Sequence, residues 1–259
     1  MDILEKIIAY KKPQIEELKK VMPVSLLEKS PFFERQTFSL PEYILVKPPG
    51  IIAEFKRKSP SKSDINIRAV PGQIIPEYEK AGAAAVSILT DSYFFGGNIE
   101  DIKNIRPQIN IPVLRKDFIF DEYQVLEAKS AGADAILLIA AVLDKKEIKK
   151  LTKLASSLGL SVLMEIHHEG ELEKLCEGID IVGVNNRNLK TFEVSLDNSL
   201  ELVDKIPAEF VKISESGIKN PEDIEILSQA GFQGFLIGES FMKTADAGRE
   251  LHKWVKELQ

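Results

Sequence analysis

Short runs of apolar residues alternate along the chain with stretches in which apolar residues recur every three or four positions. Runs of the first kind are typical of strands buried on both faces, and stretches of the second kind are typical of amphipathic helices. The pattern predicts eight strands separated by helices. The expected strands span residues 51–55, 84–89, 112–115, 135–139, 161–165, 180–184, 210–214 and 234–237.

The ends of the expected helices carry boundary signals. Asp144 and Glu147 are spaced as a capping box, and Asn220 followed by Pro221 is typical of a helix start. Three helices are expected to end at a left-handed glycine that follows an alanine, at 81–82, 131–132 and 230–231. Each of these pairs stands directly before an expected strand, so the connections between helix and strand are short.

This alternation predicts a single-domain α/β fold over residues 1–259, with a (β/α)8 barrel at 51–259. An open doubly wound sheet is the alternative, but the eight units are of nearly constant type and the chain has no Gly-x-Gly-x-x-Gly turn. Residues 1–50 are expected to form an N-terminal helical extension across one end of the barrel. Its first helix carries apolar residues on one face: Ile3, Ile7, Ile8, Ile15 and Leu18.

Charge and hydropathy narrow the class of partner. With a net charge of −6 and an isoelectric point near 5.4, the chain lacks the basic surface that suits nucleic acids and acidic lipids. A small molecule is the expected partner, with no nucleic acid and no membrane. The longest apolar run, 135–143, is too short to span a bilayer, and the first residues lack a basic-then-apolar signal. We therefore expect a cytoplasmic protein.

Ionisable residues stand at the ends of several expected strands, where (β/α)8 barrels build their active sites. The period of two puts Glu54, Lys56 and Lys58 on one face at the end of the first strand. Lys116 ends the third strand and Glu165 ends the fifth. The two carboxylates, Glu54 and Glu165, together with Lys56 and Lys116 at one barrel end, predict acid/base chemistry. Structural salt bridges across the barrel mouth are the alternative.

The seventh and eighth strands are followed by glycine-containing loops, which in barrels commonly bind phosphate through backbone N–H groups. Ser216 and Gly217 follow one strand, and Gly238 follows the other. The alternative is that both glycines only serve turns. No metal site is expected, because the adjacent His167 and His168 would point to opposite sides of an extended chain.

Eight short motifs follow one another along the chain. They are IAEFKRKSPS at 52–61, SILTD at 87–91, LRKDF at 114–118, ADAILLI at 133–139, MEIH at 164–167, GVNNRNL at 183–189, SESGI at 214–218 and LIGES at 236–240. In this order and spacing, the set resembles the indole-3-glycerol-phosphate synthase family of tryptophan biosynthesis over essentially the whole chain.

The resemblance implies a lyase that needs no cofactor. Its substrate is 1-(2-carboxyphenylamino)-1-deoxyribulose 5-phosphate, which loses carbon dioxide and water as the indole ring closes. Lys116 is implied as the general acid at the ketose carbonyl, and Lys56 and Glu54 as groups for carboxylate contact and proton transfer. Which lysine and which carboxylate act in condensation or in dehydration stays open. The remaining implied catalytic positions are Glu165, Glu215 and Asn185, the last on the sugar hydroxyls.

The resemblance also implies binding positions. Arg187 contacts an anion, and six residues correspond to positions around the phosphate: Lys58, Ser59, Ser216, Gly217, Gly238 and Glu239. An apolar wall is implied at Phe95, Phe118 and Leu137. Ser63 and Glu239 depart from the family pattern, which leaves the loop conformation and one phosphate contact open.

One physical expectation concerns the catalytic acid. Lys56 beside Lys116 is expected to lower the pKa of the acid toward working pH.

Two alternative functions are another phosphate-binding barrel isomerase and a barrel that only binds a ligand. The element at 54–61 argues against the first, and four buried charged groups argue against the second. The sequence is compatible with a monomer and does not address contacts with other enzymes of tryptophan biosynthesis.

Overall fold

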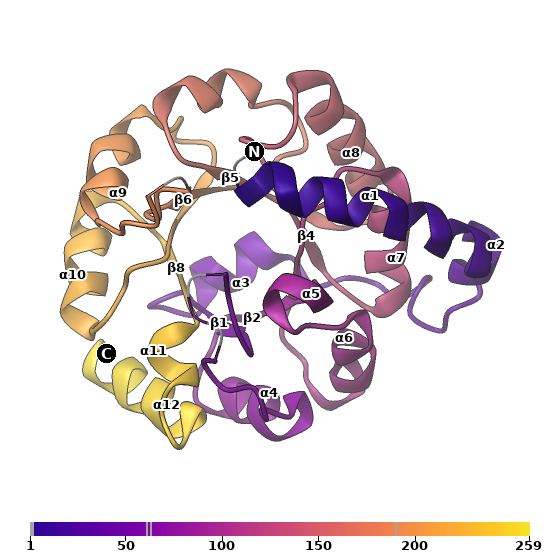
Figure 1. Cartoon of the computed structure of the whole chain (residues 1–259). Coiled ribbons are helices and arrows are strands. Elements are labelled where there is room, and N and C mark those ends of the chain that lie inside the picture. Colours follow the sequence, from indigo (N-terminus) through magenta and orange to yellow (C-terminus); the bar gives the residue numbers. More distant parts are fainter. Residues whose placement is uncertain (1–2, 61, 63, 190) are drawn as a thin grey trace.

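The computed structural model describes residues 3–60, 62, 64–189 and 191–259, in which eight parallel strands close into one barrel (Figure 1). Each strand pairs with its sequence neighbours, and β1 pairs with β8 to close the ring. The predicted (β/α)8 fold is confirmed. The strands are β1 (Ile51–Phe55), β2 (Ala85–Leu89), β3 (Val113–Lys116), β4 (Ala135–Ile139), β5 (Ser161–Ile166), β6 (Ile181–Asn185), β7 (Val211–Glu215) and β8 (Gly234–Ile237).

Helices surround the barrel and also cover its two ends (Figure 1). Between β5 and β6 the chain forms a 3-10 helix, η2 (Glu169–Lys174), in place of an α-helix. None of the described helices is long and apolar enough to cross a membrane. The others are α1 (Ile3–Val21), α2 (Val24–Leu27), α3 (Leu40–Val46), α4 (Pro71–Lys80), α5 (Ser92–Phe95), α6 (Ile99–Ile105), η1 (Arg106–Gln108), α7 (Glu122–Ala131), α8 (Lys145–Ser157), α9 (Asp197–Leu202), η3 (Val203–Lys205), α10 (Pro221–Ala230), α11 (Glu239–Met242) and α12 (Ala247–Glu257).

The predicted helix boundaries are confirmed. The Asp144 carboxylate accepts hydrogen bonds from the N–H groups of Lys146 and Glu147, and Glu147 in turn accepts from the Asp144 N–H. The Asn220 side chain caps α10 by accepting from the Asp223 N–H. The three glycines that follow alanine all have positive φ, at Gly82, Gly132 and Gly231.

Several strands extend one residue further toward their C-terminal ends than the apolar pattern predicts. Lys116, Asn185 and Glu215 are the last residues of β3, β6 and β7. Lys116 pairs with Leu89 of β2, and Asn185 pairs with Glu215. The polar residues that the pattern placed just beyond the strands are therefore held in the sheet, which fixes the direction of their side chains.

Alternate residues of each strand enter two different cores. Ile51, Ala53 and Phe55 of β1 face the helices, whereas Ile52 joins the cluster inside the barrel. The interior cluster also contains Leu40 and Ile44 of α3, and Ile7 of α1. The barrel interior is therefore a packed core and not a channel, which is typical of eight-stranded barrels.

Helix α1 crosses the barrel end at which the strands terminate (Figure 1). Of the residues on the predicted apolar face, Ile7 and Ile15 are buried, whereas Leu18 is exposed. Lys11 is the third buried residue of the helix. Its Nζ lies 3.1 Å from Asp91 Oδ2 and 2.7 Å from Asp117 Oδ1, and these carboxylates neutralise the buried ammonium.

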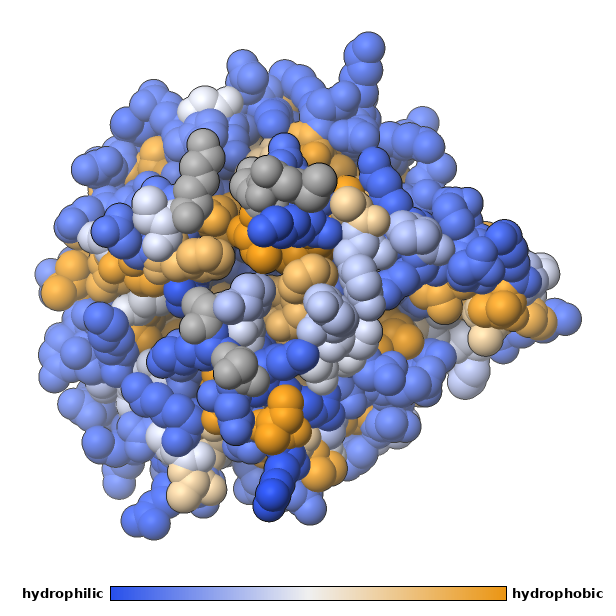
Figure 2. All heavy atoms as spheres, in the orientation of Figure 1, coloured by the Kyte–Doolittle hydropathy of each residue, from blue (hydrophilic) through white to orange (hydrophobic). Residues whose placement is uncertain are grey.

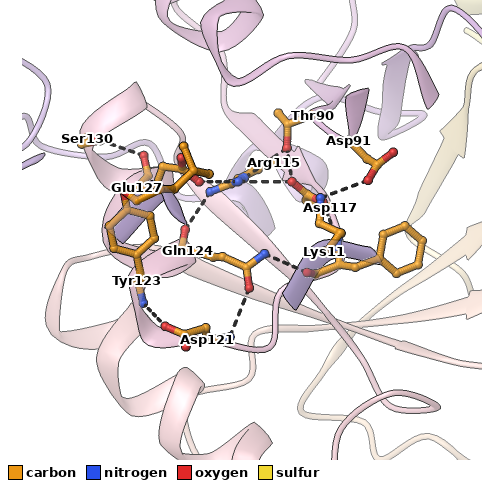
Figure 3. A network of polar contacts seen from close by, with 12 residues as sticks. Lys11, Thr90, Asp91, Arg115, Asp117, Asp121, Tyr123, Gln124, Glu127 and Ser130 are labelled. Carbon is orange, nitrogen blue, oxygen red and sulfur yellow. Dashed lines mark hydrogen bonds and ion pairs between the residues drawn. The ribbon is translucent and has the colours of Figure 1, made fainter. Parts of the chain in front are cut away.

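The Lys11 ion pairs belong to a polar network that also includes residues of β3 and α7 (Figure 3). Asp117 also contacts Arg115 at 3.2 Å and accepts a hydrogen bond from Thr90. Burial opposes ionisation of Asp117, but Lys11 and Arg115 outweigh it and lower the pKa of this carboxyl to about 2. Because Asp117 directly follows Lys116 in sequence, α1 is anchored beside the end of β3 that carries Lys116.

Lys11→Met should destabilise the fold, because it removes the cation from two buried carboxylates. The expected loss in the free energy of unfolding is about 3 kcal/mol, measured by urea denaturation at pH 7. Lys12→Met, at an exposed position of the same helix, is the control and should change stability by less than about 0.5 kcal/mol. Equal stability of the two variants would contradict an anchoring role for Lys11.

Candidate active site

A cavity of about 480 Å³ lies at the C-terminal end of the barrel, beneath α1. The surface of this face is mostly hydrophilic, with hydrophobic residues gathered around its middle (Figure 2). An enclosed cavity with apolar walls and a few converging polar groups is typical of a small-molecule site. The cover is formed by Ile3, Leu4 and Ile7 of α1, and ionisable residues from the strand ends form the floor.

All the predicted site residues except Lys58 line this cavity. The Lys58 side chain lies beside Gly96 in the loop after β2. Two further positions considered in the sequence, Ser61 and Ser63, lie outside the described residues. The lining residues are Glu54, Lys56, Ser59, Phe95, Lys116, Phe118, Leu137, Glu165, Asn185, Arg187, Glu215, Ser216, Gly217, Gly238 and Glu239.

Lys116 is the centre of the charged floor. Its Nζ lies 3.1 Å from Glu165 Oε2 and also contacts Glu215 Oε2, so β3, β5 and β7 meet through one ammonium group. Beside this triad, Lys56 donates to Glu54 Oε1 at 2.5 Å. These lysine and carboxylate side chains are all largely buried. The floor therefore holds two cations and three carboxylates in close contact.

The expectation that a second lysine lowers the pKa of the acid is wrong for Lys116. Burial does oppose the charge of Lys116, but three carboxylates outweigh burial and raise its pKa above the ordinary value: Glu215, Glu165 and Glu54. The sequence showed which charges stand at the strand ends, but not that carboxylates would be the nearest neighbours of this lysine. Lys116 is therefore held in its charged form.

The two carboxylates that contact Lys116 differ from each other. Burial, supported by the charges of Glu165 and Glu54, raises the pKa of Glu215 to about 7, although Lys116 acts in the opposite direction. Burial also opposes ionisation of Glu165, but Lys116 and His167 outweigh it and lower its pKa. Glu215 can therefore exchange a proton near neutral pH, whereas Glu165 remains ionised.

Two glycines leave space for the carboxylates of Glu215 and Glu54. A Cβ on Gly183 of β6 would overlap Oε1 of Glu215, and a Cβ on Gly238 would lie 2.6 Å from Oε1 of Glu54. Gly238 thus serves the approach of Glu54, in addition to any role toward a phosphate. Sequence reasoning did not single out Gly183, although a glycine inside an otherwise apolar strand is a known sign of a close approach.

Comparison with known proteins gives the same assignment as the ordered motifs. The family model for indole-3-glycerol phosphate synthase matches residues 4–254. The chain belongs to this family. A member from Bacteroides thetaiotaomicron is 46% identical over 258 residues, covering 100% of this chain and 99% of its own. One from Campylobacter jejuni subsp. doylei is 44% identical over 254 residues, covering 96% and 98%. The family predicted from the sequence is confirmed.

Solved structures of lower sequence identity share the fold. A 3-hexulose-6-phosphate synthase from Salmonella typhimurium superposes with a TM-score of 0.61 at 15% identity, covering 81% of this chain and 99% of its own. A chain of the tryptophan synthase complex from Pyrococcus furiosus gives a TM-score of 0.57 at 16% identity, covering 80% and 96%. Identities this low support the barrel fold alone.

Two ends of the cavity differ in polarity in this member of the indole-3-glycerol phosphate synthase family. At β7 and β8, Ser216 and Gly217 both have positive φ, so the chain turns sharply, and Lys219 and Lys243 reach the lining. Neither lysine was predicted, because both lie beyond the strand-end motifs. Lys62 also lines this end, where it forms an ion pair with Glu239.

The opposite end of the cavity is apolar. The rings of Phe95 and Phe118 lie 6.0 Å apart at 37°, and Leu137 of β4 completes this wall. Further apolar lining residues, which the sequence reasoning missed, come from α1 and from the loop after β6. They are Ile3, Leu4, Ile7, Leu189, Phe192 and Val194, the last of which lies beside Gly217 at the β7 end.

The two adjacent histidines differ in burial, but the prediction that they point to opposite sides is wrong, because both rings approach the Glu171 carboxylate. The side chain of His167 is 11% exposed and that of His168 is 69% exposed. No group of three or more potential metal ligands occurs among the residues that the structure describes.

Gly183→Ala should lower kcat about 10- to 100-fold, because the added methyl group displaces the Glu215 carboxylate from Lys116. Steady-state rates of indole formation, with circular dichroism to verify folding, measure the effect. Gly72→Ala is the matched control, since the nearest atom to its added Cβ is 3.7 Å away and lies outside the cavity. Unchanged kcat in Gly183→Ala would show that the position of Glu215 does not matter for the reaction.

Proposed function

We propose that this protein catalyses the reaction of its family, the ring closure of 1-(2-carboxyphenylamino)-1-deoxyribulose 5-phosphate to indole-3-glycerol phosphate, carbon dioxide and water. The observation that supports this most directly is the buried Lys116 ammonium between Glu165 and Glu215, at the floor of a cavity with one apolar and one cationic end. A substrate with an aromatic ring and a phosphate fits such a cavity in one orientation.

The two ends of the cavity suit the two ends of this substrate. We place the aromatic ring against Phe95, Phe118 and Leu137, and its carboxylate near Lys56. The phosphate is placed at the opposite end, on the backbone of the loops after β7 and β8. Its proposed partners there are Ser59, Ser216, Gly217, Gly238 and Glu239, with Lys58 if its side chain turns inward from Gly96. The ketose carbonyl then lies over Lys116.

In this orientation Lys116 acts as the general acid of condensation. As the ring carbon attacks the carbonyl carbon, negative charge develops on the carbonyl oxygen, where the Lys116 ammonium stabilises it. An alkoxide is more basic than any lysine amine, so the proton passes from Lys116 even though neighbouring carboxylates raise the pKa of this lysine. Carbon dioxide then leaves, and the ring regains its aromaticity.

Dehydration requires an acid for the departing hydroxyl and a base for the methylene proton. We assign these transfers to Glu54, Lys56, Glu165 and Glu215 as a set that acts with Lys116. Asn185 is proposed to hold the sugar hydroxyls, and Arg187 an anionic group of the substrate. Because these protein groups supply each transfer, the proposed mechanism needs no cofactor and no metal ion.

We further propose that the protein works in the cytoplasm as a monomer on this small phosphorylated substrate. The net charge of −6 and the lack of a membrane-spanning helix among those described support a location away from nucleic acids and membranes. The residues that the proposed mechanism uses all belong to one chain, so the reaction as proposed calls for no residue of a second copy.

Lys116→Met should lower kcat at least about 100-fold without unfolding the protein, because the acid that protonates the ketone is lost. The rate is measured by the absorbance of the indole formed from purified substrate. Lys153→Met, at an exposed position of α8, should leave kcat unchanged. If Lys116→Met raised KM and left kcat unchanged, Lys116 would bind the substrate without acting as the acid.

Gly217→Val should weaken binding of both substrate and inorganic phosphate. Gly217 has a φ of +84°, and a Cβ there would lie 2.5 Å from Cγ1 of Val194, so the loop must move. We expect KM and the inhibition constant of phosphate to rise together, at least about 10-fold. Gly231→Ala places a side chain on an equally strained backbone away from the cavity and should change neither constant. Unaltered phosphate inhibition in Gly217→Val would place the phosphate elsewhere.

A further inference from the structure

A row of alternating carboxylates and imidazoles leads from Lys116 toward the surface. Glu165 contacts Lys116 with Oε2, and its other oxygen, Oε1, lies 3.4 Å from Nε2 of His167. Nδ1 of His167 lies 3.8 Å from Oε2 of Glu171, whose Oε1 lies 3.4 Å from Nε2 of His168. Each inner member of the row therefore presents different atoms to the groups on either side of it.

Burial along the row changes only at its outer end. The side chains of Glu165, His167 and Glu171 are 5%, 11% and 5% exposed, whereas that of His168 is 69% exposed. The row borders a second cavity, of about 980 Å³, which contains His167, His168 and Glu171 but not Lys116. It thus links the floor of the substrate cavity to solvent by a separate route.

The unusual connection after β5 creates this arrangement. The 3-10 helix η2 brings Glu171 back toward the end of β5, where its Oε2 accepts a hydrogen bond from the His167 N–H at 2.6 Å. A regular α-helix in this place would carry the side chain at position 171 along the outside of the barrel. The local structure thus places a second carboxylate on the far side of the His167 ring.

His167 lies among acids and lacks a fixed partner. Neither ring nitrogen makes a hydrogen bond to any of the described residues, although both are buried. Burial opposes a charge on this imidazole, but three carboxylates outweigh it and raise the pKa of His167: Glu171 of η2, Glu165 of β5 and Glu215 of β7. A neutral imidazole with a carboxylate beside each nitrogen can accept a proton at one nitrogen and release another from the other nitrogen.

The proposed reaction requires a supply of protons. The carbonyl oxygen takes up two protons to leave as water, and the methylene carbon releases one. A carboxylate with one negative charge leaves as neutral carbon dioxide, so each turnover consumes one proton from solvent. Substrate fills the cavity above Lys116, and α1 covers it, so a proton that entered from that side would have to pass the substrate.

We propose that His167, together with Glu171 and His168, carries the consumed proton from solvent to Glu165 and on to Lys116. The proton enters at Nε2 of His168 and passes to Oε1 of Glu171. The Glu171 carboxyl group rotates so that its O–H faces His167 and protonates Nδ1, and the Nε2 proton of His167 moves to Oε1 of Glu165. The Glu165 carboxyl group likewise turns its O–H toward Lys116, returns a proton to the neutral amine and is again a carboxylate. A flip of the His167 ring then restores its starting tautomer. His167 acts through Glu165 and is therefore a positioning residue that relays protons.

Small rotations of the rings are sufficient for the transfers, because the gaps of 3.4 and 3.8 Å exceed a hydrogen bond by only a few tenths of an ångström to about one ångström. The inference rests on the proposed ring closure, since that reaction creates the demand for protons. It adds a route that the catalytic set in the substrate cavity does not provide.

His167→Gln tests the relay, because glutamine retains polarity but cannot take up a proton. We expect kcat to fall about 10-fold at low buffer concentration with KM within about twofold of wild type. Added imidazole, which fits the second cavity, should restore kcat at least about fivefold in a saturable manner. Wild-type kcat should not depend on imidazole, and His252→Gln, at an exposed position of α12, should behave as wild type.

Glu171→Gln is the second variant, since its amide oxygen can still accept from the His167 N–H while the titratable carboxylate is lost. It should lose kcat to a similar extent and show the same response to imidazole. Wild-type kcat in both variants would overturn the relay, as would a loss of kcat that neither imidazole nor pH alters, because that result indicates a structural role. Wild-type turnover of the substrate is measured first, so failure of the proposed function is detected separately.

Discussion

The burial of the Lys116 ammonium is the constraint on which the rest of the site depends. A cation removed from water is strongly destabilising unless opposite charges neutralise it, and here Glu165 and Glu215 contact it directly. Burial, supported by the charges of Glu165 and Glu54, raises the pKa of Glu215 to about 7, while the carboxylates around Lys116 keep that lysine charged. The cluster therefore contains a fixed cation and a carboxyl that can exchange a proton near neutral pH.

The barrel gives this cluster its precision. Lys116 and Glu215 end strands whose pairing continues to the last residue, so their positions depend on the sheet and not on loops. Glycines occur where a side chain would meet a carboxylate: Gly183 beside Glu215 and Gly238 beside Glu54. Strand pairing and the two glycines thus hold like charges close together, although such charges would repel each other in water.

Two features beyond the regular barrel complete the site. Helix α1 covers the mouth with apolar residues and is anchored through Lys11 to Asp117, the residue next to Lys116. On the other side, η2 replaces an α-helix and sets Glu171 against His167. One feature shields the reacting groups from water, and the other provides a route by which protons can reach them.

The sequence by itself determined the alternation of strands and helices, the closed barrel, the helix caps and the ionisable residues at the strand ends. These follow from local periodicity, from end signals and from the rule that strand ends face one mouth. Only the tertiary structure decided which charges are neighbours. Lys116 and Glu215 lie 99 positions apart and Lys11 and Asp91 lie 80 apart, so no local pattern reports their contact. The raised pKa of Lys116, the burial of Lys11 and the turning of Lys58 toward Gly96 all depend on such contacts between distant segments.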